Sequence, residues 1–144
     1  MAAYRYPITI RFQHCDPAGI VFYPRYFEMF NLVIETWFET ALDHSFKKMH
    51  YVSNFGIPTV NIDTTFSAPS LLEDTIDFEL TIQQLGTSSL VLKIEGKCRG
   101  VLRCNDIHTI VCVDMKTRKS QPWPDQLRMQ MIEFQEKPND QNKA

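Results

Sequence analysis

The sequence predicts an α+β domain in which one long helix lies on a five-stranded antiparallel sheet. Apolar residues follow a period of two up to residue 12, a period of three to four over 24–42, and a period of two again over 57–113. Short connections join the later strands, which favours antiparallel neighbours. The 144 residues suffice for one domain, which we expect over 1–136, with 137–144 as a polar C-terminal tail.

A first strand is expected over residues 4–12. Its apolar side chains alternate with Arg5, Thr9 and Arg11, as in a strand with one buried face. The strand stops at the run Asp16-Pro17-Ala18-Gly19, where proline and glycine occupy positions that a type I turn prefers. The alternating apolar residues are Tyr4, Tyr6, Ile8, Ile10 and Phe12.

An amphipathic helix of about five turns is expected to begin at Pro24. Proline suits the first helical position, because the N–H that it lacks would have no helical partner there. Polar side chains separate the apolar ones, so one broad face is apolar. Such a helix would be about 30 Å long and would span the sheet as a central helix. The apolar pairs are Tyr26/Phe27, Met29/Phe30, Val33/Ile34, Trp37/Phe38 and Ala41/Leu42.

Four further strands and a short helix complete the predicted order. The run Gly86-Thr87-Ser88-Ser89 forms the turn before the fourth strand, and the corner at Pro122 and Pro124 precedes a helix over 123–136. The residues that mark the four strands are Val60, Ile62, Thr64 and Phe66; Ile76, Phe78, Leu80 and Ile82; Leu90, Leu92 and Ile94; and Ile107, Thr109, Val111 and Val113.

Composition and charge exclude several classes of protein. The formal net charge of −2 gives no basic surplus for nucleic acid, so no such partner is expected. No signal segment is visible and no apolar stretch approaches the roughly 20 residues that cross a bilayer, so we expect a cytoplasmic protein without a membrane partner. The four cysteines lack the spacing of a zinc site, and we predict no metal, no other cofactor and no disulfide.

The segment 14–24 carries the candidate chemistry. Asp16 follows a strand and offers a nucleophile or a general base. The helix that begins eight residues later offers unpaired N–H groups at the positive end of its dipole. Because Pro24 has no N–H, the backbone of Tyr23 carries the first free donor, and we predict it as the oxyanion donor. The competing interpretation is that an aspartate before proline only forms a turn with its own backbone.

Three other residues are predicted to bind substrate. His14 stands two residues before Asp16 and would share its face if the strand continued, so it can orient the carboxylate or the substrate. Phe22 belongs to the apolar run that precedes the helix, although such a run is core by default. Thr59 follows a proline where the second strand begins and can border the substrate pocket. The remaining histidines, His44, His50 and His108, have no partner at metal-ligand spacing and are interpreted as structural.

The run 16–26 resembles the most specific motif of the 4-hydroxybenzoyl-CoA thioesterase family. That motif is aspartate-proline-alanine-glycine followed by an apolar pair, aromatics and a proline, and here it reads Asp16-Pro17-Ala18-Gly19-Ile20-Val21-Phe22-Tyr23-Pro24. The order of one strand, a helix and four strands extends the resemblance over residues 4–114. The resemblance implies the hot-dog fold, in which a five-stranded antiparallel sheet wraps around one long central helix, here from Pro24 to about Phe46.

The resemblance also implies a function. Asp16 matches the family's active-site aspartate, and Tyr23 matches the position whose N–H meets the thioester oxygen. The expected substrate is an acyl-CoA, aromatic like 4-hydroxybenzoyl-CoA or short-chain. Family members form homodimers by joining sheets edge to edge and often pair into homotetramers, with active sites between protomers. One departure concerns the turn 86–89, which lacks the basic residues that often lie there in relatives that bind coenzyme A, so the groups that hold its phosphates are unassigned.

Two alternatives stay open at the level of sequence. A non-catalytic acyl-CoA-binding or regulatory protein can share the hot-dog fold, and release of thiol from a panel of acyl-CoAs distinguishes it from an enzyme. Hydratases and dehydratases of the same fold use a histidine with an acidic partner, in motifs that this sequence does not contain.

Overall fold

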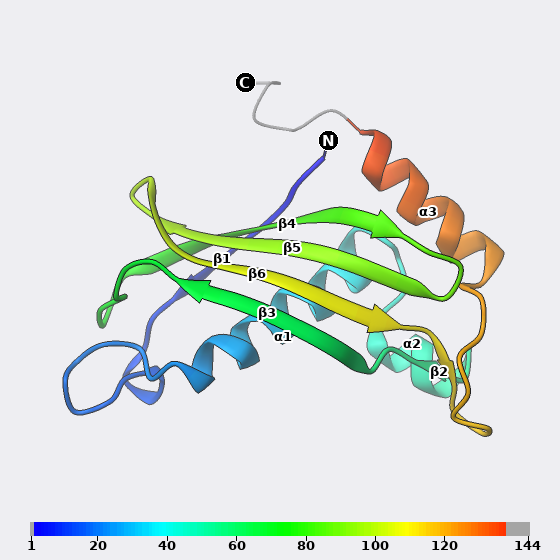
Figure 1. Ribbon diagram of the computed structural model, residues 1–144, viewed down its shortest axis with the longest axis horizontal. Helices are drawn as coiled ribbons and strands as arrows, with labels where there is room; N and C mark the ends of the chain where they lie inside the picture. Colours follow the sequence, from blue (N-terminus) through cyan, green and yellow to red (C-terminus); the bar gives the residue numbers. More distant parts are fainter. Residues whose placement is uncertain (1, 138–144) are drawn as a thin grey trace.

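A five-stranded antiparallel sheet is the framework of the computed structural model, which describes residues 2–137 (Figure 1). The strands are β1 (Tyr4–Thr9), β2 (Phe55–Gly56), β3 (Thr59–Phe66), β4 (Thr75–Leu85), β5 (Ser89–Cys98), β6 (Val101–Val111) and β7 (Val113–Asp114), and the helices are α1 (Pro24–Thr40), α2 (Phe46–Tyr51) and α3 (Asp125–Glu136). The main sheet has the order β1-β4-β5-β6-β3, and β2 pairs with β7. The predicted α+β class and five antiparallel strands are confirmed, and β1 and β3 are the edges.

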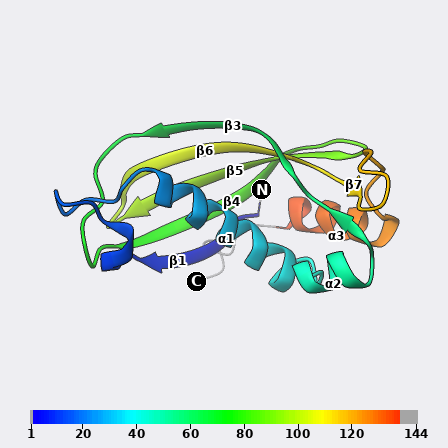
Figure 2. The same cartoon turned by 90° about the horizontal axis from the view of Figure 1, so that it is seen from below.

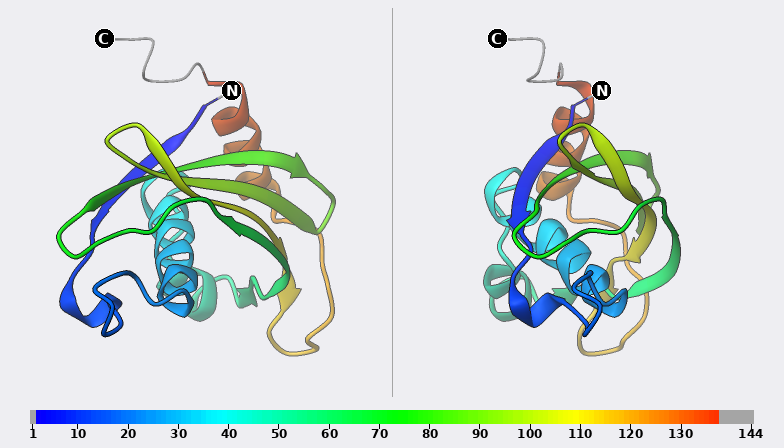
Figure 3. Two further views of the ribbon diagram at one scale, coloured as in Figure 1. Left: turned by 60° about the vertical axis from the view of Figure 1, so that its left-hand side comes forward. Right: turned by 90° about the vertical axis from the view of Figure 1, so that its left-hand side faces the viewer.

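Helix α1 lies against one face of the sheet, which curls around it (Figures 2 and 3). It begins at Pro24, as predicted. The predicted apolar stripe forms its buried face, and burying a large apolar side chain fully contributes roughly 1.5–3 kcal/mol. The buried residues are Tyr26, Met29, Phe30, Val33, Ile34, Trp37 and Phe38.

The prediction of one long central helix up to about Phe46 is wrong. Helix α1 has 17 residues and ends at Thr40, which gives a length of about 25 Å. The chain then turns at Asp43, whose φ of 48° is incompatible with a continuing helix. Ser45 starts the separate helix α2, and its side chain accepts a hydrogen bond of 3.1 Å from the Lys48 N–H.

The two central strands, β4 and β5, bury the faces that the sequence predicts. Each inward side chain is fully buried, and each faces α1 or packs beside it in one continuous core. Because the two strands pair in register, Leu80 lies opposite Ile94 and Ile82 opposite Leu92. The predicted residues that are fully buried are Ile76, Phe78, Leu80, Ile82, Leu90, Leu92 and Ile94.

Strand β6 buries the opposite face from the one predicted. Asp106 and His108 are buried, whereas the apolar residue Ile107 between them is only half-buried. Asp106 and His108 lie opposite Ile94 and Leu92 of β5, so the ladder places them on the core side. Burial is tolerated because the two polar side chains bond to each other.

The edge strand β3 is exposed along most of its length. Its predicted apolar residues Val60, Ile62 and Phe66 are exposed by 60%, 43% and 42%, so the core formed by residues 2–137 leaves them only partly covered. Its other edge carries the ladder to β6. The free edge of β3 is therefore an open template for a further strand.

The two ends of the chain depart in small ways from prediction. Strand β1 ends at Thr9 instead of residue 12, and Phe12–His14 forms a 3₁₀ turn. Helix α3 forms close to its predicted bounds and packs Phe134 edge-to-face on Trp37 at 5.4 Å. The predicted tail covers 137–144, and from residue 138 on it lies outside the described residues. The four cysteines are unpaired, and over residues 2–137 no helix is long and apolar enough to cross a membrane.

Candidate active site

The segment that carries the predicted motif forms a tight hairpin over residues 14–22, between β1 and α1. The N–H of Gly19 donates to the carbonyl of Asp16 at 2.9 Å, and that of Asp16 donates to Ile20 at 3.0 Å. Gly19 has φ of +80°, a region that favours glycine. Phe22 donates back to His14 at 2.9 Å and closes the hairpin. The predicted turn is confirmed, and the hairpin fixes the path from Asp16 to the start of α1.

Asp16 is half-buried and keeps part of its carboxylate free. Its Oδ1 accepts a hydrogen bond of 2.9 Å from the Ala18 N–H, which is the self-turn that the competing interpretation expects. Its Oδ2 accepts no hydrogen bond from residues 2–137. The side chain lines a cavity of about 340 Å³ together with Phe12, Cys15, Pro17, Gly19 and Leu72. The bond to Ala18 orients the carboxylate, and the second oxygen can still act on a ligand.

The backbone N–H of Tyr23 is a free donor at the start of α1. The next two available donors are used, because Arg25 donates to Phe22 at 2.8 Å and Tyr26 donates to Tyr23 at 3.1 Å. Pro24 has no N–H, and the Tyr23 N–H has no acceptor within residues 2–137. An N–H in this place, with the helix dipole behind it, favours an anion.

Asp16 and Tyr23 line different cavities in a single chain. The cavity beside Tyr23 has about 350 Å³ and shares no lining residue with the cavity beside Asp16. The sequence places both groups within eight residues, but the hairpin separates their cavities. Any site that uses both groups must therefore extend around the hairpin. The Tyr23 cavity is lined by Ile20, Val21, Tyr23, Tyr26, Phe66, Ser67, Ala68, Pro69 and Ser70.

His14 does not share a face with Asp16. The prediction required the first strand to continue to Asp16, and it does not. The strand has ended by then, and the 3₁₀ turn directs the ring elsewhere: Nδ1 accepts from the Arg11 N–H at 2.8 Å. His14 lines a cavity of about 460 Å³ together with Arg25 and Glu28. Burial, followed by the charge of Arg25, lowers the pKa of His14.

Phe22 and Thr59 lie in different surroundings. Phe22 is 46% exposed and packs edge-to-face on Tyr23 at 5.6 Å, so it belongs to the hairpin surface rather than the core. Thr59 is the first residue of β3 and is exposed. It lines a cavity of about 510 Å³ at the opposite end of β3 from Phe66. The structure thus keeps Phe22 near the motif and places Thr59 at a second location.

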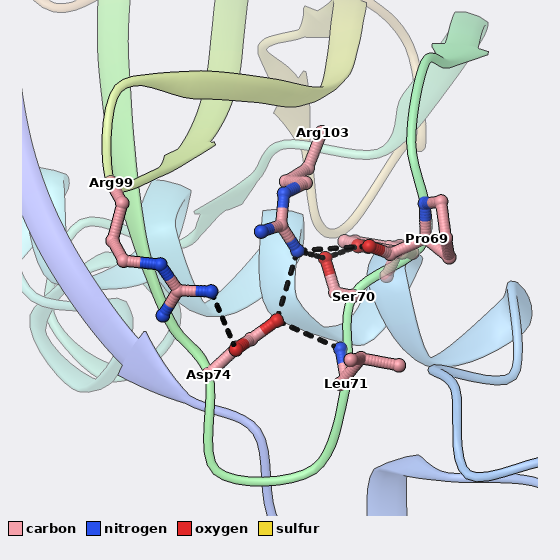
Figure 4. Close-up of polar contacts among 7 residues, drawn as sticks. Pro69, Ser70, Leu71, Asp74, Arg99 and Arg103 are labelled. Carbon is pink, nitrogen blue, oxygen red and sulfur yellow. Dashed lines mark hydrogen bonds and ion pairs between the residues drawn. The ribbon is translucent and has the colours of Figure 1, made fainter.

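A buried ion pair, which sequence reasoning missed, fastens the hairpin to the sheet (Figure 4). Arg103 of β6 and Asp74, which precedes β4, form an ion pair of 2.9 Å and are 8% exposed each. The same Arg103 nitrogen donates to the carbonyl of Pro69 at 2.9 Å and to the hydroxyl of Ser70 at 3.3 Å. We call Ser70, Asp74 and Arg103 the Arg103 clamp.

The Arg103 clamp reaches the hairpin from both sides. The carbonyl of Ser70 accepts the Val21 N–H at 2.9 Å, and its hydroxyl accepts the Tyr26 hydroxyl at 2.6 Å. The carbonyl of Asp74 accepts the Ile10 N–H at 2.7 Å. The clamp therefore fixes the chain before Asp16, the chain after it, and the first turn of α1.

The Asp74 carboxylate is held in its ionised form. The Leu71 N–H donates to it at 2.9 Å, and Arg103 donates to it as well; together they lower the pKa of Asp74. Arg99 adds a longer contact of 3.5 Å. No spacing in the sequence signals this pair, because 29 residues separate its members.

A second polar cluster lies behind Thr59. His108 Nε2 lies 2.8 Å from the Thr59 hydroxyl, and its Nδ1 lies 2.9 Å from the carboxylate of Asp106. The Thr64 hydroxyl donates to the other oxygen of that carboxylate at 2.8 Å. The sequence predicts a structural role for His108 and contains no hydratase motif of a histidine with an acidic partner. The signal was the i,i+2 spacing of Asp106 and His108, which places both on one face of a strand.

Within residues 2–137, no three histidine, cysteine or acidic side chains are close enough to hold a metal ion.

Known proteins resemble this chain over the region that contains the candidate site. The family model of the thioesterase-like superfamily matches residues 10–131. A 1,4-dihydroxy-2-naphthoyl-CoA hydrolase of Nostoc punctiforme is 25% identical over 127 residues, which are 87% of this chain and 84% of that protein. The match to the family model includes the hairpin, α1 and β3.

Solved structures show the same fold. A 1,4-dihydroxy-2-naphthoyl-CoA thioesterase from Synechocystis has a TM-score of 0.85 at 21% identity and covers 94% of this chain and 100% of its own. A gentisyl-coenzyme A thioesterase has a TM-score of 0.78 at 24% identity and covers 89% of this chain and 99% of its own. The predicted resemblance is confirmed at the level of the superfamily and its hot-dog fold. The narrower 4-hydroxybenzoyl-CoA family stays a prediction.

Proposed function

Because the chain belongs to the thioesterase-like superfamily, we propose that it hydrolyses acyl-CoA thioesters with Asp16 as its catalytic carboxylate. The observation that carries the proposal is the free N–H of Tyr23 at the start of α1, joined to Asp16 by a hairpin that the Arg103 clamp holds. The named relative from Nostoc punctiforme, an acyl-CoA hydrolase, supports the reaction class. A cytoplasmic location stays a prediction.

The proposed chemistry uses two groups of this chain. The thioester oxygen accepts the Tyr23 N–H, which stabilises the negative charge that develops when the carbonyl is attacked; one such donor is worth roughly 3 kcal/mol. Asp16 either attacks the carbonyl and releases the thiolate, giving an anhydride that water hydrolyses, or removes a proton from the attacking water. In both routes the products are the free acid and coenzyme A, and the carboxylate is regenerated.

We propose that two copies of the chain complete the site. The free edge of β3 is exposed, and two β3 strands can pair antiparallel about a twofold axis. Thr59 and Phe66, the two ends of β3, lie about 24 Å apart along one strand. Antiparallel pairing would bring Thr59 of the second copy toward Phe66 of the first, which lines the Tyr23 cavity. A homodimer would then join the Thr59 cavity of one copy to the reactive groups of the other, and further pairing would give a homotetramer.

For the acyl group we propose a hydroxylated aromatic ring. The relatives named above act, as their names state, on 1,4-dihydroxy-2-naphthoyl-CoA and gentisyl-CoA, and both acyl groups are of this kind. The Thr59 cavity supports the proposal because most of its lining is apolar, as an aromatic ring requires. 4-Hydroxybenzoyl-CoA belongs to the same class, and short-chain acyl-CoAs are the comparison that tests it.

A panel of acyl-CoAs tests the proposal directly. The purified protein is incubated with 1,4-dihydroxy-2-naphthoyl-, gentisyl-, 4-hydroxybenzoyl-, benzoyl- and acetyl-CoA, and released thiol is followed. We expect release from the hydroxylated aromatic esters first, and loss of that release in the Asp16→Asn variant. Binding of the esters without thiol release would favour the alternative of a non-catalytic acyl-CoA-binding protein.

A further inference from the structure

The Thr59 hydroxyl is the outer end of a chain of hydrogen bonds that begins in the core. Asp106 is fully buried, His108 is 4% exposed, and Thr59 is exposed at the rim of the cavity of about 510 Å³. The bonds run from Thr64 to Asp106, from His108 to Asp106, and between His108 and Thr59, all at 2.8–2.9 Å. We call these four residues the Thr59 relay.

The direction of each hydrogen bond follows from the chemistry of the groups. An ionised carboxylate only accepts, so Nδ1 of His108 carries the hydrogen that points to Asp106. When the His108 ring is neutral, its Nε2 is an acceptor and the Thr59 hydroxyl donates to it. With Asp106 ionised and His108 neutral, the proton of Thr59 is used inside the protein, and its oxygen presents lone pairs to the cavity.

The rest of the cavity sets the kind of ligand that can meet this oxygen. Its volume lies within the range of about 300–1,000 Å³ typical of small-molecule sites. The lining is mainly apolar, with Asn31, His50 and Arg118 as further polar residues. The apolar residues are Ile34, Phe46, Ile57, Pro58, Ile110, Val113 and Met115.

We propose that the Thr59 relay selects acyl groups that carry a hydroxyl, by accepting a hydrogen bond from that hydroxyl at Thr59. His108 and Asp106 act as positioning residues, because they fix the direction of the Thr59 proton without touching the ligand. A hydroxyl donates to the Thr59 oxygen, whereas a ring without one leaves that oxygen unpaired and a methoxy group offers it no proton. The inference rests on the proposed thioesterase function and specifies the acyl group that the enzyme prefers.

The test is the ratio of kcat/KM for matched pairs of esters, measured at one pH near about 7, where the phenolic hydroxyls keep the proton that they donate. The pairs are 4-hydroxybenzoyl-CoA with benzoyl-CoA and with 4-methoxybenzoyl-CoA, and 1,4-dihydroxy-2-naphthoyl-CoA with 2-naphthoyl-CoA. The Thr59→Val variant keeps the shape of threonine but has no hydroxyl. In the pair for which the wild type shows the largest preference, we expect the preference for the hydroxylated ester to fall roughly fivefold to tenfold. The Thr59→Ser variant keeps the acceptor and should keep most of the preference.

A control on the same strand separates this effect from a change in β3. Thr65 is exposed on β3 and has no side-chain hydrogen bond within the described residues, and Thr65→Val should leave the ratio as in the wild type. An unchanged ratio in Thr59→Val, or an equal fall in Thr65→Val, would overturn the inference while the thioesterase function stands. If wild-type protein releases thiol from none of these esters, the proposed function fails instead. Calorimetry then measures the affinities of the same variants for 4-hydroxybenzoate and for benzoate. The ratio of these affinities tests the role of the Thr59 relay in the same way.

Discussion

The two polar clusters on β6 differ in where their hydrogen bonds end. The hydrogen bonds of the Arg103 clamp reach the main chain of Val21 in the hairpin and of Ile10 before it, and the hydroxyl of Tyr26. The Thr59 relay ends on an exposed hydroxyl beside a cavity. Both bury charged or titratable groups in one strand, but the first holds backbone and the second presents an acceptor. The difference assigns positioning of the reactive groups to the clamp and selection of the acyl group to the relay.

Replacing the carboxylate that the clamp positions gives the largest expected effect. In Asp16→Asn, kcat for the best acyl-CoA should fall about 10²- to 10⁴-fold, because the amide is neither a base nor a nucleophile. The Ala18 N–H can still donate to the amide oxygen, so the hairpin should stay folded. Turnover is measured by thiol release and folding by the thermal midpoint. Near-normal turnover with an intact fold would remove Asp16 from the mechanism.

Breaking the clamp should lower stability more than removing the exposed Thr59 hydroxyl of the relay. Arg103→Met leaves the nearly buried Asp74 carboxylate without its main partner, and we expect a loss of about 2–3 kcal/mol in the free energy of unfolding. This is less than the 3–5 kcal/mol typical of enclosed pairs, because the exposed Arg99 also contacts Asp74. Urea unfolding measures the change. Thr59→Val, at an exposed position, should lose less than about 1 kcal/mol, and equal losses would erase the distinction between the clusters.

The clamp should also give the stability a specific dependence on acid. The folded pKa of Asp74 lies below its ordinary value of 3.8. Its contribution is therefore complete above that value and is lost as the pH falls below it toward the folded pKa. Asp74→Asn should thus show a shallower decline in the free energy of unfolding than the wild type between about pH 4 and pH 2. Denaturant titrations across this range measure the free energy of unfolding of both proteins. Parallel declines in the wild type and the variant would contradict the ionic part of the clamp.

A smaller effect than the loss of Arg103 is expected from Tyr26, whose hydroxyl donates to the clamp at Ser70. Tyr26→Phe removes the donor to Ser70 at 2.6 Å but keeps the buried ring. We expect a loss of about 1 kcal/mol in stability. Because Tyr26 lies in the first turn of α1, kcat should fall a fewfold while KM for the acyl-CoA stays near its wild-type value. A change confined to KM would indicate that Tyr26 contacts the substrate and does not position the helix.

The parts of the fold that the sequence predicts are those in which side-chain polarity and burial agree. Strands β4 and β5 alternate aliphatic and polar residues, and their aliphatic faces are buried. The stripe of α1 follows the same rule. The prediction failed at the end of α1, because Ala41 and Leu42 continue the apolar pattern while the backbone of Asp43 leaves the helical region.

The candidate site was predictable only where a motif is local. Asp16, Gly19, Tyr23 and Pro24 are neighbours in sequence, so the hairpin and the free N–H follow from it. The Arg103 clamp joins residues far apart in the chain, and nothing near Asp74 announces its partner. On β6 the prediction favoured the apolar face, whereas Asp106 and His108 satisfy each other and occupy the core side. A polar pair at i,i+2 in a strand that pairs with a buried strand is the signal to follow.

Mixed dimers test the central claim, which is that Asp16 and Tyr23 of one chain act on an acyl group held by the Thr59 cavity of another. Co-expressed Asp16→Asn and Thr59→Val chains with different tags would be purified as the heterodimer. If sites form between chains, one site unites an intact Asp16 with an intact Thr59, and the heterodimer should recover the wild-type preference for the hydroxylated ester at about half the activity. If each chain forms its own site, only Thr59→Val sites turn over, and a ratio as low as that of the Thr59→Val homodimer would contradict the claim.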